Sequence, residues 1–195
     1  PLRRDLLANR IASIRAIING TTNYILTGLA RTGAVGQALR AQGIEPPGGA
    51  GFAEALADAQ RLGYAESDPT NDVEGYDAAY KLAIMATLGF RSRVRPSQID
   101  TTGITKLHPR DFQYAQELGY VIKLLAVAEQ TDAGEIGVRV HPTMVPLEHP
   151  LASVRESFNA IFVEGAAVGD LMFYGRGAGG SPTASAILGD LIDAS

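Results

Sequence analysis

The sequence predicts an α+β fold, in which an open, mostly antiparallel or mixed β-sheet carries helices packed on one face. Helical periodicity dominates the first half of the chain, whereas strand patterns gather in the second half. Elements that are grouped in this way, and do not alternate, are typical of α+β architecture. The 195 residues, 46% of them hydrophobic, suffice for one sizeable core.

The first half holds one strand between helical segments. Its apolar residues recur mostly at helical spacing, and the cluster Pro46-Pro47-Gly48-Gly49 interrupts the pattern. In chain order, we expect a helical start over residues 2–9, a strand over Ile14–Ile18, a helix over Thr21–Arg31 with Asn19 or Thr21 near its cap, a loop or partial helix over residues 32–51, and a helix over Phe52–Leu62 closed by Gly63.

A further helix is predicted in the middle of the chain. Asn71 is the expected N-cap, with Glu74 three residues later as its capping-box partner. Apolar and aromatic residues recur at helical spacing from Tyr76 to Ala86, and Gly89 is the expected stop.

The second half turns to strands after one more helix. Long apolar runs and period-two alternation indicate strands, and a Ser-Pro pair near the C-terminus indicates a helix entry, with Ser181 as cap and Pro182 at the first helical position. In chain order, we expect a helix over Pro109–Leu118, strands over Tyr120–Ala128 and Gly137–Val145, and a hairpin of Phe158–Val163 with Val168–Tyr174 across residues 164–167.

Five carboxylates precede one lysine in the segment from Glu66 to Lys81. They belong to Glu66, Asp68, Asp72, Glu74 and Asp77. Asp77 and Lys81 are four residues apart, so they lie one turn apart on the same helix face. The chain can therefore gather negative charge and one ammonium group at a single helix mouth.

The residues alone leave this cluster open to other interpretations. Acids near a helix N-terminus complement the macrodipole, and an Asp–Lys pair four residues apart forms an ordinary exposed salt bridge. Clustered carboxylates also suit a divalent cation. However, no Asp-x-Asp-x-Asp-Gly loop follows, and Lys81 would oppose the charge of the cation.

The composition argues against several partners and chemistries. A net charge of −4 without a basic run disfavours nucleic acid, and no apolar stretch approaches the length of a membrane span. The absence of cysteine excludes disulfides and thiolate chemistry. The three histidines, at 108, 141 and 149, share no ligand spacing and each precedes a proline, so we expect structural roles and no metal site.

Two further segments, taken with the acidic one, resemble homoserine dehydrogenases. The first contains Asn19-Gly20-Thr21-Thr22-Asn23-Tyr24, the central block runs from Ala59 to Lys81, and the last contains Gly175-Arg176-Gly177-Ala178-Gly179-Gly180-Ser181-Pro182-Thr183. The resemblance covers nearly the whole chain, including Phe158-Asn159-Ala160. It implies the fold of that family's catalytic domain and a cytoplasmic enzyme of amino-acid biosynthesis.

The resemblance also assigns roles to residues. It implies that homoserine and aspartate 4-semialdehyde are interconverted, with hydride passing to or from NAD or NADP. Lys81 matches the proton donor and Asp77 its carboxylate neighbour, which favours the charged ammonium. The matching substrate-binding positions are Glu66, Asp72, Thr21, Gly20 and Tyr64.

The glycine-rich segment near the C-terminus is expected to contact the cofactor. Its Gly-x-Gly-x-x-Gly pattern is not a Rossmann fingerprint, because no second strand or ribose-binding acid can follow it. By resemblance, Gly177, Gly179 and Gly180 contact the cofactor. The alternative is that these glycines form a tight turn needed only for packing. Arg139 and Arg176 could contact a phosphate group or could be ordinary surface residues.

The resemblance implies two regions and an absent domain. Residues 1–175 are expected to bind substrate and form a homodimer, and residues 176–195 to return toward a nucleotide-binding domain that this chain lacks. The family also uses a lysine and a metal-binding backbone segment from before residue 1. We therefore expect the chain alone to be inactive. The rival interpretation is a non-catalytic dimerisation module whose acidic loop only caps a helix.

Overall fold

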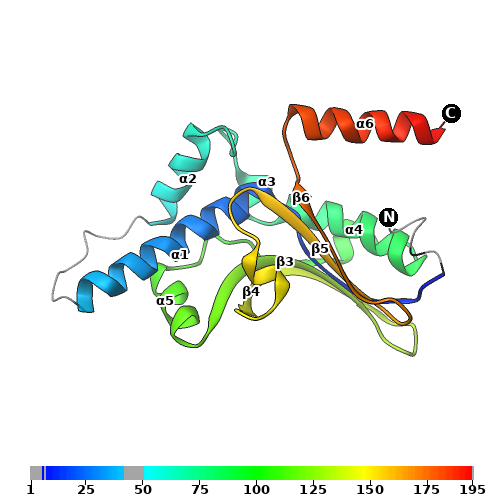
Figure 1. Cartoon of the computed structure of the whole chain (residues 1–195), viewed down its shortest axis with the longest axis horizontal. Helices are drawn as coiled ribbons and strands as arrows, with labels where there is room; N and C mark the ends of the chain where they lie inside the picture. The colour runs from blue at the N-terminus through cyan, green and yellow to red at the C-terminus, as the bar shows by residue number, and fades with distance from the viewer. Residues whose placement is uncertain (1–5, 7, 42–50, 195) are drawn as a thin grey trace.

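The computed structural model describes residues 6, 8–41 and 51–194, and within them the predicted α+β class is confirmed. The strands join in one sheet of order β2-β4-β3-β1-β5-β6 (Figure 1). Neighbouring strands are antiparallel except β2, which pairs with β4 in parallel. The strands are β1 (Ile11–Ile17), β2 (Asp100–Thr101), β3 (Tyr120–Gln130), β4 (Ile136–Pro146), β5 (Phe158–Gly165) and β6 (Gly169–Arg176).

The helices are α1 (Gly20–Ala41), α2 (Phe52–Arg61), α3 (Thr70–Val73), α4 (Tyr76–Phe90), α5 (Pro109–Glu117) and α6 (Gly180–Ala194), with the 3₁₀ turns η1 (Pro96–Gln98) and η2 (Pro150–Ser153). Two helices, α2 and α5, fall close to their predicted positions. The predicted hairpin is confirmed as β5 and β6, which pair from Phe158 with Arg176 to Gly165 with Gly169. Among the described helices, none is long and apolar enough to cross a membrane.

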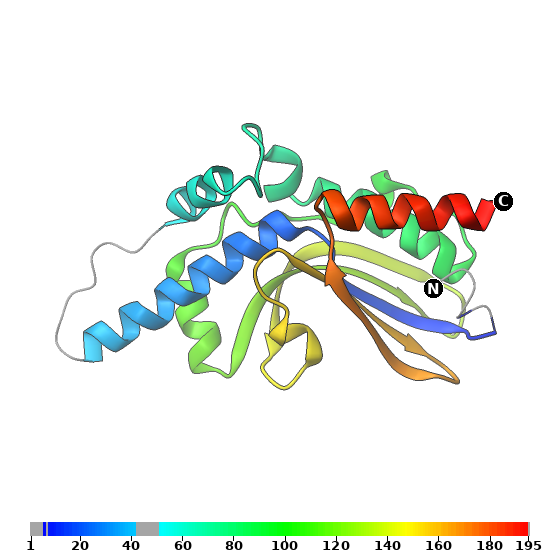
Figure 2. The same cartoon turned by 45° about the horizontal axis from the view of Figure 1, so that its top comes forward.

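The main core lies between the sheet and the helices α1, α4 and α5 (Figure 2). Successive side chains of a strand point to opposite faces, so Leu124 and Ala126 of β3 enter this core while Leu125 and Val127 face the other side. On that other side, η2 covers a smaller apolar cluster. The prediction of helices on one face therefore holds for α1, α4 and α5, and a 3₁₀ turn protects part of the opposite face.

The prediction of one helix capped by Asn71 and Glu74 was wrong. The chain forms two helices, α3 and α4, separated at Gly75, whose φ of +84° is in the left-handed region. The cause is a tertiary contact: a Cβ on Gly103 would lie 2.3 Å from the Val73 carbonyl oxygen, and Ile104 N donates to that oxygen at 2.8 Å. The carboxylate of Glu74 accepts a hydrogen bond from Thr105 Oγ1 at 2.9 Å and does not cap a helix.

Gly89 does not end α4, contrary to prediction. The helix continues to Phe90, and its C-cap is Arg91 with φ of +52°. Gly89 instead permits close packing on β1, since a Cβ there would lie 2.9 Å from Ile14 Cδ1. A small residue in a helix can thus mark a close approach to a neighbouring strand and not an end.

Three further predictions concern the ends of helices. The first long helix runs ten residues beyond Arg31, to Ala41, which agrees with the partial helix expected within residues 32–51, while residues 42–50 lie outside the described residues. The expected helix over residues 2–9 falls mostly outside them too, and its described part is a turn in which Asn9 N donates to Leu6 O at 2.9 Å. The helix α6 begins at Gly180, so Ser181 lies inside its first turn and is not its cap.

One lysine lies inside the fold. Lys123 of β3 is 4% exposed, and its Nζ donates to Asn23 Oδ1 at 3.1 Å and to the Val154 carbonyl. Burial, with a smaller contribution from the positive charge of Arg155, lowers the pKa of Lys123 from 10.5 to about 8. Burial disfavours the charged form because the protein interior solvates an ammonium group poorly.

The depressed pKa of Lys123 predicts a rise in stability at alkaline pH. Between the folded pKa of about 8 and the unfolded value of 10.5, the unfolded chain binds more protons, so the free energy of unfolding increases with pH, by about 3 kcal/mol in total. Urea unfolding across this pH range measures it. The Lys123→Met variant lacks the titrating group and should show a flatter profile, and parallel profiles would contradict the assignment.

Candidate active site

Asn19 opens the helix α1 and binds two acidic side chains. Its Oδ1 accepts a hydrogen bond from Thr22 N at 2.9 Å, which is the contact of an N-cap residue. Its Nδ2 donates to Asp72 Oδ1 at 2.7 Å and to Asp77 Oδ2 at 2.8 Å. Asn19 is only 5% exposed, so one carboxamide joins the start of α1 to both α3 and α4.

Lys81 shares one of these carboxylate oxygens. Its Nζ donates to Asp77 Oδ2 at 2.7 Å and to the Ile18 carbonyl at 3.2 Å. The side chain of Lys81 is 48% exposed and that of Asp77 is 30% exposed. The ammonium group is therefore held in place at the end of β1 while it still faces solvent.

These groups line a cavity of about 440 Å³, built from segments far apart in the sequence. The walls come from the β1–α1 junction, the loop before α3, the helices α3 and α4, and the segment after β6. Thr21 Oγ1 donates to the Tyr64 carbonyl at 2.6 Å, and the Tyr64 ring lies 4.9 Å from that of Tyr24. The predicted residues that line the cavity are Gly20, Thr21, Tyr64, Asp72, Asp77, Lys81, Gly177 and Gly179.

Two predicted residues do not line this cavity. Glu66 is exposed on the loop before α3, and its backbone carbonyl accepts from Gln60 Nε2 at 3.0 Å. Gly180 begins α6. Of the five carboxylates in the acidic segment, Asp72 and Asp77 face the cavity.

Asp68 has a local role at the start of α3. Its Oδ1 accepts from Thr70 Oγ1 at 2.6 Å and from Thr70 N at 3.1 Å. These hydrogen bonds, the one from the hydroxyl foremost, lower the pKa of the Asp68 carboxyl. Part of the acidic segment therefore stabilises a helix start, as the simpler interpretation of the sequence held.

A glycine-rich cradle, formed by Gly177 and Gly179 beside Asn159, lines another part of the cavity. A Cβ on Gly177 would lie 1.8 Å from Asn159 Nδ2, so the Asn159 amide packs directly against bare backbone. Gly179 has φ of +125°, a conformation that side chains rarely permit. The Oδ1 atom of Asn159 is buried and has no hydrogen-bond partner within the described residues. The contact with Asn159 accounts for the glycine at position 177 by packing. Gly177 and Gly179 also line the cavity, where backbone without side chains permits the close approach of a ligand.

Sequence reasoning did not assign several lining residues. Asn19 was expected only to cap a helix, and no role was predicted for Ser157 or Asn159. Asn19 and Asn159 nevertheless belong to segments that resemble the known family. Arg176, left open as a phosphate contact, lines the cavity with its guanidinium carbon 5.0 Å above the Phe158 ring. Arg139 instead pairs with Glu129 at 3.0 Å on the sheet.

Within the described part of the chain, no three acidic or histidine side chains gather closely enough to hold a metal ion. The cavity offers the ammonium group of Lys81, the guanidinium group of Arg176, the carboxylates of Asp72 and Asp77, and a glycine cradle. That donor set suits a small polar ligand with a positive group and an oxygen that can accept a proton.

The sequence and the α+β fold match a family of oxidoreductases. The family model described as homoserine dehydrogenase matches residues 1–192. The chain belongs to the homoserine dehydrogenase family.

Its relatives show how much of the family's length the chain represents. It is 50% identical to the homoserine dehydrogenase of Corynebacterium glutamicum over 198 residues, which is 100% of this chain and 41% of that protein. With the Bacillus subtilis enzyme it shares 42% identity over 98% of this chain and 40% of the relative. The chain thus spans about two fifths of the curated relatives it matches.

Solved structures give the same fold. The homoserine dehydrogenase of Thiobacillus denitrificans superposes with a TM-score of 0.87 at 45% identity, covering 98% of this chain and 41% of that one. A hyperthermophilic archaeal homoserine dehydrogenase mutant, solved in complex with NADPH, superposes with a TM-score of 0.72 at 26% identity, covering 98% of this chain and 49% of that one.

The shared contacts of Asn19 predict that this side chain is essential to the local fold. In Asn19→Ala, the carboxylates of Asp72 and Asp77 lose their common hydrogen-bond donor, and α1 loses its N-cap. We therefore expect the free energy of unfolding to fall by about 1–3 kcal/mol. Urea unfolding measures it. The exposed Asn71→Ala variant is the matched control and should change stability by less than about 0.5 kcal/mol. Equal losses in both variants would refute the role of Asn19.

Proposed function

We propose that this chain forms the substrate-binding and catalytic part of an enzyme that interconverts L-homoserine and L-aspartate 4-semialdehyde. The observation that carries the proposal is the Asp77 carboxylate, whose Oδ2 is shared by Asn19 and Lys81 at the mouth of the cavity. This arrangement orients one ammonium group at a site large enough for an amino acid. We take the reaction from the activity for which the family is named.

The substrate is held by its own ammonium group. Asp72 lines the cavity and has one carboxylate oxygen bonded to Asn19, which leaves the other oxygen for a ligand. Glu66 stands on the adjoining exposed loop, and its contact with substrate stays a prediction. Gly20, Thr21 and Tyr64 form the wall beside Asp72, where they contact the substrate through backbone or side chain.

Lys81 moves the proton. Its ammonium group faces the cavity and is fixed by Asp77 and by the Ile18 carbonyl. As the aldehyde is reduced, Lys81 polarises the carbonyl oxygen and donates a proton to the developing alkoxide. In the reverse direction the neutral amine accepts the proton of the hydroxyl group.

NAD or NADP, when bound, supplies or accepts the hydride. Gly177 and Gly179 line the cavity, and backbone without side chains permits the close approach of a flat ring. One structural relative is an NADPH complex. We assign residues 1–175 to substrate binding and catalysis and residues 176–195 to the segment that returns to a nucleotide-binding domain. The isolated chain should therefore be inactive without that domain.

The sheet face opposite the helices supports the proposal of a homodimer. Arg15 pairs with Glu164 at 2.6 Å and with Glu129 at 3.6 Å, and Arg139 pairs with Glu129 at 3.0 Å. The Ser13 hydroxyl, together with Arg15, lowers the pKa of the Glu164 carboxyl. These ion pairs hold charged side chains in place on the same face that η2 covers in part. A non-catalytic assembly module would use the same face. Such a module would not require Lys81 to line a cavity, as it does here.

Removal of the Lys81 amine should abolish most of the turnover. With the chain joined to its upstream coding sequence, Lys81→Ala should lower kcat by about 10²–10⁴, the contribution of a general acid, with a smaller effect on the KM for cofactor. Formation of reduced nicotinamide from homoserine measures it. The exposed Lys106→Ala variant is the control and should keep full activity. Turnover that survives in Lys81→Ala would remove this lysine from the mechanism.

The glycine cradle predicts a second kinetic difference. In the same joined protein, Gly177→Ala places a methyl group 1.8 Å from Asn159 Nδ2, so the cradle must shift and the KM for NAD(P) should rise at least several-fold. Gly175→Ala is the matched control, because a Cβ there meets nothing within 4 Å and no cofactor contact is assigned to this residue. Equal cofactor KM values for the two variants would argue that the glycines serve only a turn.

A further inference from the structure

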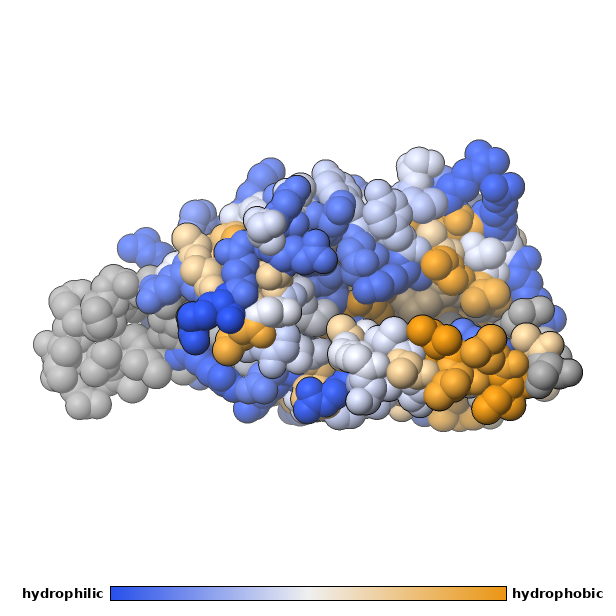
Figure 3. Space-filling view, turned by 90° about the horizontal axis from the view of Figure 1, so that it is seen from above, coloured by the Kyte–Doolittle hydropathy of each residue, from blue (hydrophilic) through white to orange (hydrophobic). Residues whose placement is uncertain are grey.

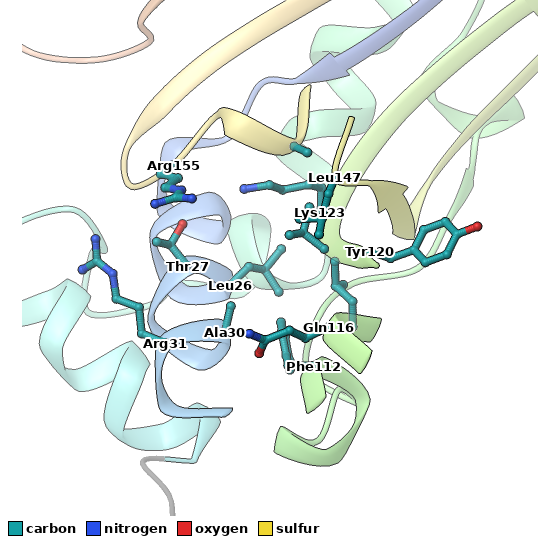
Figure 4. A pocket seen from close by; sticks show the side chains of 13 residues that line it. Leu26, Thr27, Ala30, Arg31, Phe112, Gln116, Tyr120, Lys123, Leu147 and Arg155 are labelled. Atoms are coloured by element: carbon teal, nitrogen blue, oxygen red, sulfur yellow. The ribbon is translucent and has the colours of Figure 1, made fainter. Parts of the chain in front are cut away.

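A second cavity lies further along α1, beside residues 26–31, whereas the candidate active site lies at the start of this helix. It has a volume of about 270 Å³ and is enclosed by α1, α5, β3 and the segment around η2 (Figure 4). Its walls are mostly apolar, with Leu26, Ala30, Phe112 and Leu147 among them. No residue is shared between the linings of the two cavities, so this space has no part in the proposed reaction.

All of the charged residues that line this cavity are cationic. They are Arg31, Lys123 and Arg155. Arg31 is neutralised at the rim, where it pairs with Glu156 at 2.7 Å. Lys123 and Arg155 have no ion pair with any described residue. Figure 4 shows the side chain of Lys123 extending across the cavity toward the guanidinium group of Arg155.

A buried positive charge without a counter-ion is unusual, since the loss of hydration is not repaid by a nearby negative charge. Lys123 is 4% exposed, and both of its acceptors, Asn23 Oδ1 and the Val154 carbonyl, are uncharged. An ammonium group has three N–H donors, so one is left over. The charge of Arg155 adds to the cost of keeping Lys123 protonated. An anion between the two groups would remove both penalties.

We propose that this cavity binds a small aliphatic carboxylate. The carboxylate group lies between Arg155 and Lys123, and the apolar body lies against Leu26, Ala30 and Phe112. A guanidinium group is suited to carboxylate because its N–H donors form a planar fork. The volume is just below the range of about 300–1,000 Å³ typical of drug-sized ligands, so a short chain fits and a dinucleotide does not.

Titration of the full chain with hexanoate tests the proposal, with amide chemical shifts in NMR spectra as the readout. We expect saturable binding that perturbs the residues lining the cavity. The neutral hexanamide should bind at least about tenfold more weakly, because it lacks the charge-assisted hydrogen bonds. No saturable binding of hexanoate, or equal affinity for hexanamide, would overturn the proposal.

Two arginine variants separate a specific site from general charge attraction. Arg155 is exposed, so Arg155→Gln should fold normally and bind hexanoate at least about tenfold more weakly. The exposed Arg93→Gln variant makes the same change of net charge away from the cavity and should bind as the unaltered chain does. Equal losses in both variants would refute the site. Cavity signals that shift on protein dilution without hexanoate would assign the space to a second copy of the chain and equally refute it.

Discussion

The carboxamide of Asn19 is the constraint on which the geometry of the candidate active site depends. It caps α1 through Thr22 N and donates to both Asp72 and Asp77. Two carboxylates this close together would repel each other without a common donor. Because Asp77 Oδ2 also accepts from Lys81, the position of the ammonium group follows from the same side chain. The end of β1, the start of α1 and the helices α3 and α4 are thereby joined at one point.

The break between α3 and α4 makes that joint possible. On a continuous helix, two residues five positions apart differ in direction by about 140°, so Asp72 and Asp77 could not both reach one amide. Gly75, with φ of +84°, turns the chain between them. Gly103 packs against the Val73 carbonyl at the same place and leaves no space for a side chain. Two glycines distant in sequence therefore shape the cavity although neither of them lines it.

The sequence predicted those features that depend on local spacing. The pairing of Asp77 with Lys81 follows from a separation of four residues, and the hairpin of β5 and β6 follows from two alternating runs around a turn. The break at Gly75 could not be predicted, because its cause is the contact with Gly103, nearly thirty residues later. Asn71 and Glu74 satisfied a capping pattern that this tertiary contact overrode.

The site itself was predicted through motifs more than through chemistry. Residues from three separated segments line one cavity, but Asp72 is in it and Glu66 is not, a difference that depends on the path of a loop. Asn159 gave no periodic or charge signal, and its importance is visible only where its amide meets Gly177. Buried Lys123 was hidden in an apolar strand pattern, since only tertiary packing reveals that it has no counter-ion.

The α6 helix has a consequence for assembly. In the described structure it buries none of its residues, and Ile187, Leu188, Leu191 and Ile192 stay exposed; apolar side chains gather over it in Figure 3. Exposed apolar surface of this kind favours association with another surface.

The most direct measurement of the central claim is a crystal structure of the protein with L-homoserine. We expect the ammonium group of homoserine against Asp72 and its hydroxyl within hydrogen-bond distance of Lys81 Nζ. Homoserine bound elsewhere, or with its hydroxyl turned away from Lys81, would contradict the claim that Asn19, Asp77 and Lys81 build the catalytic site.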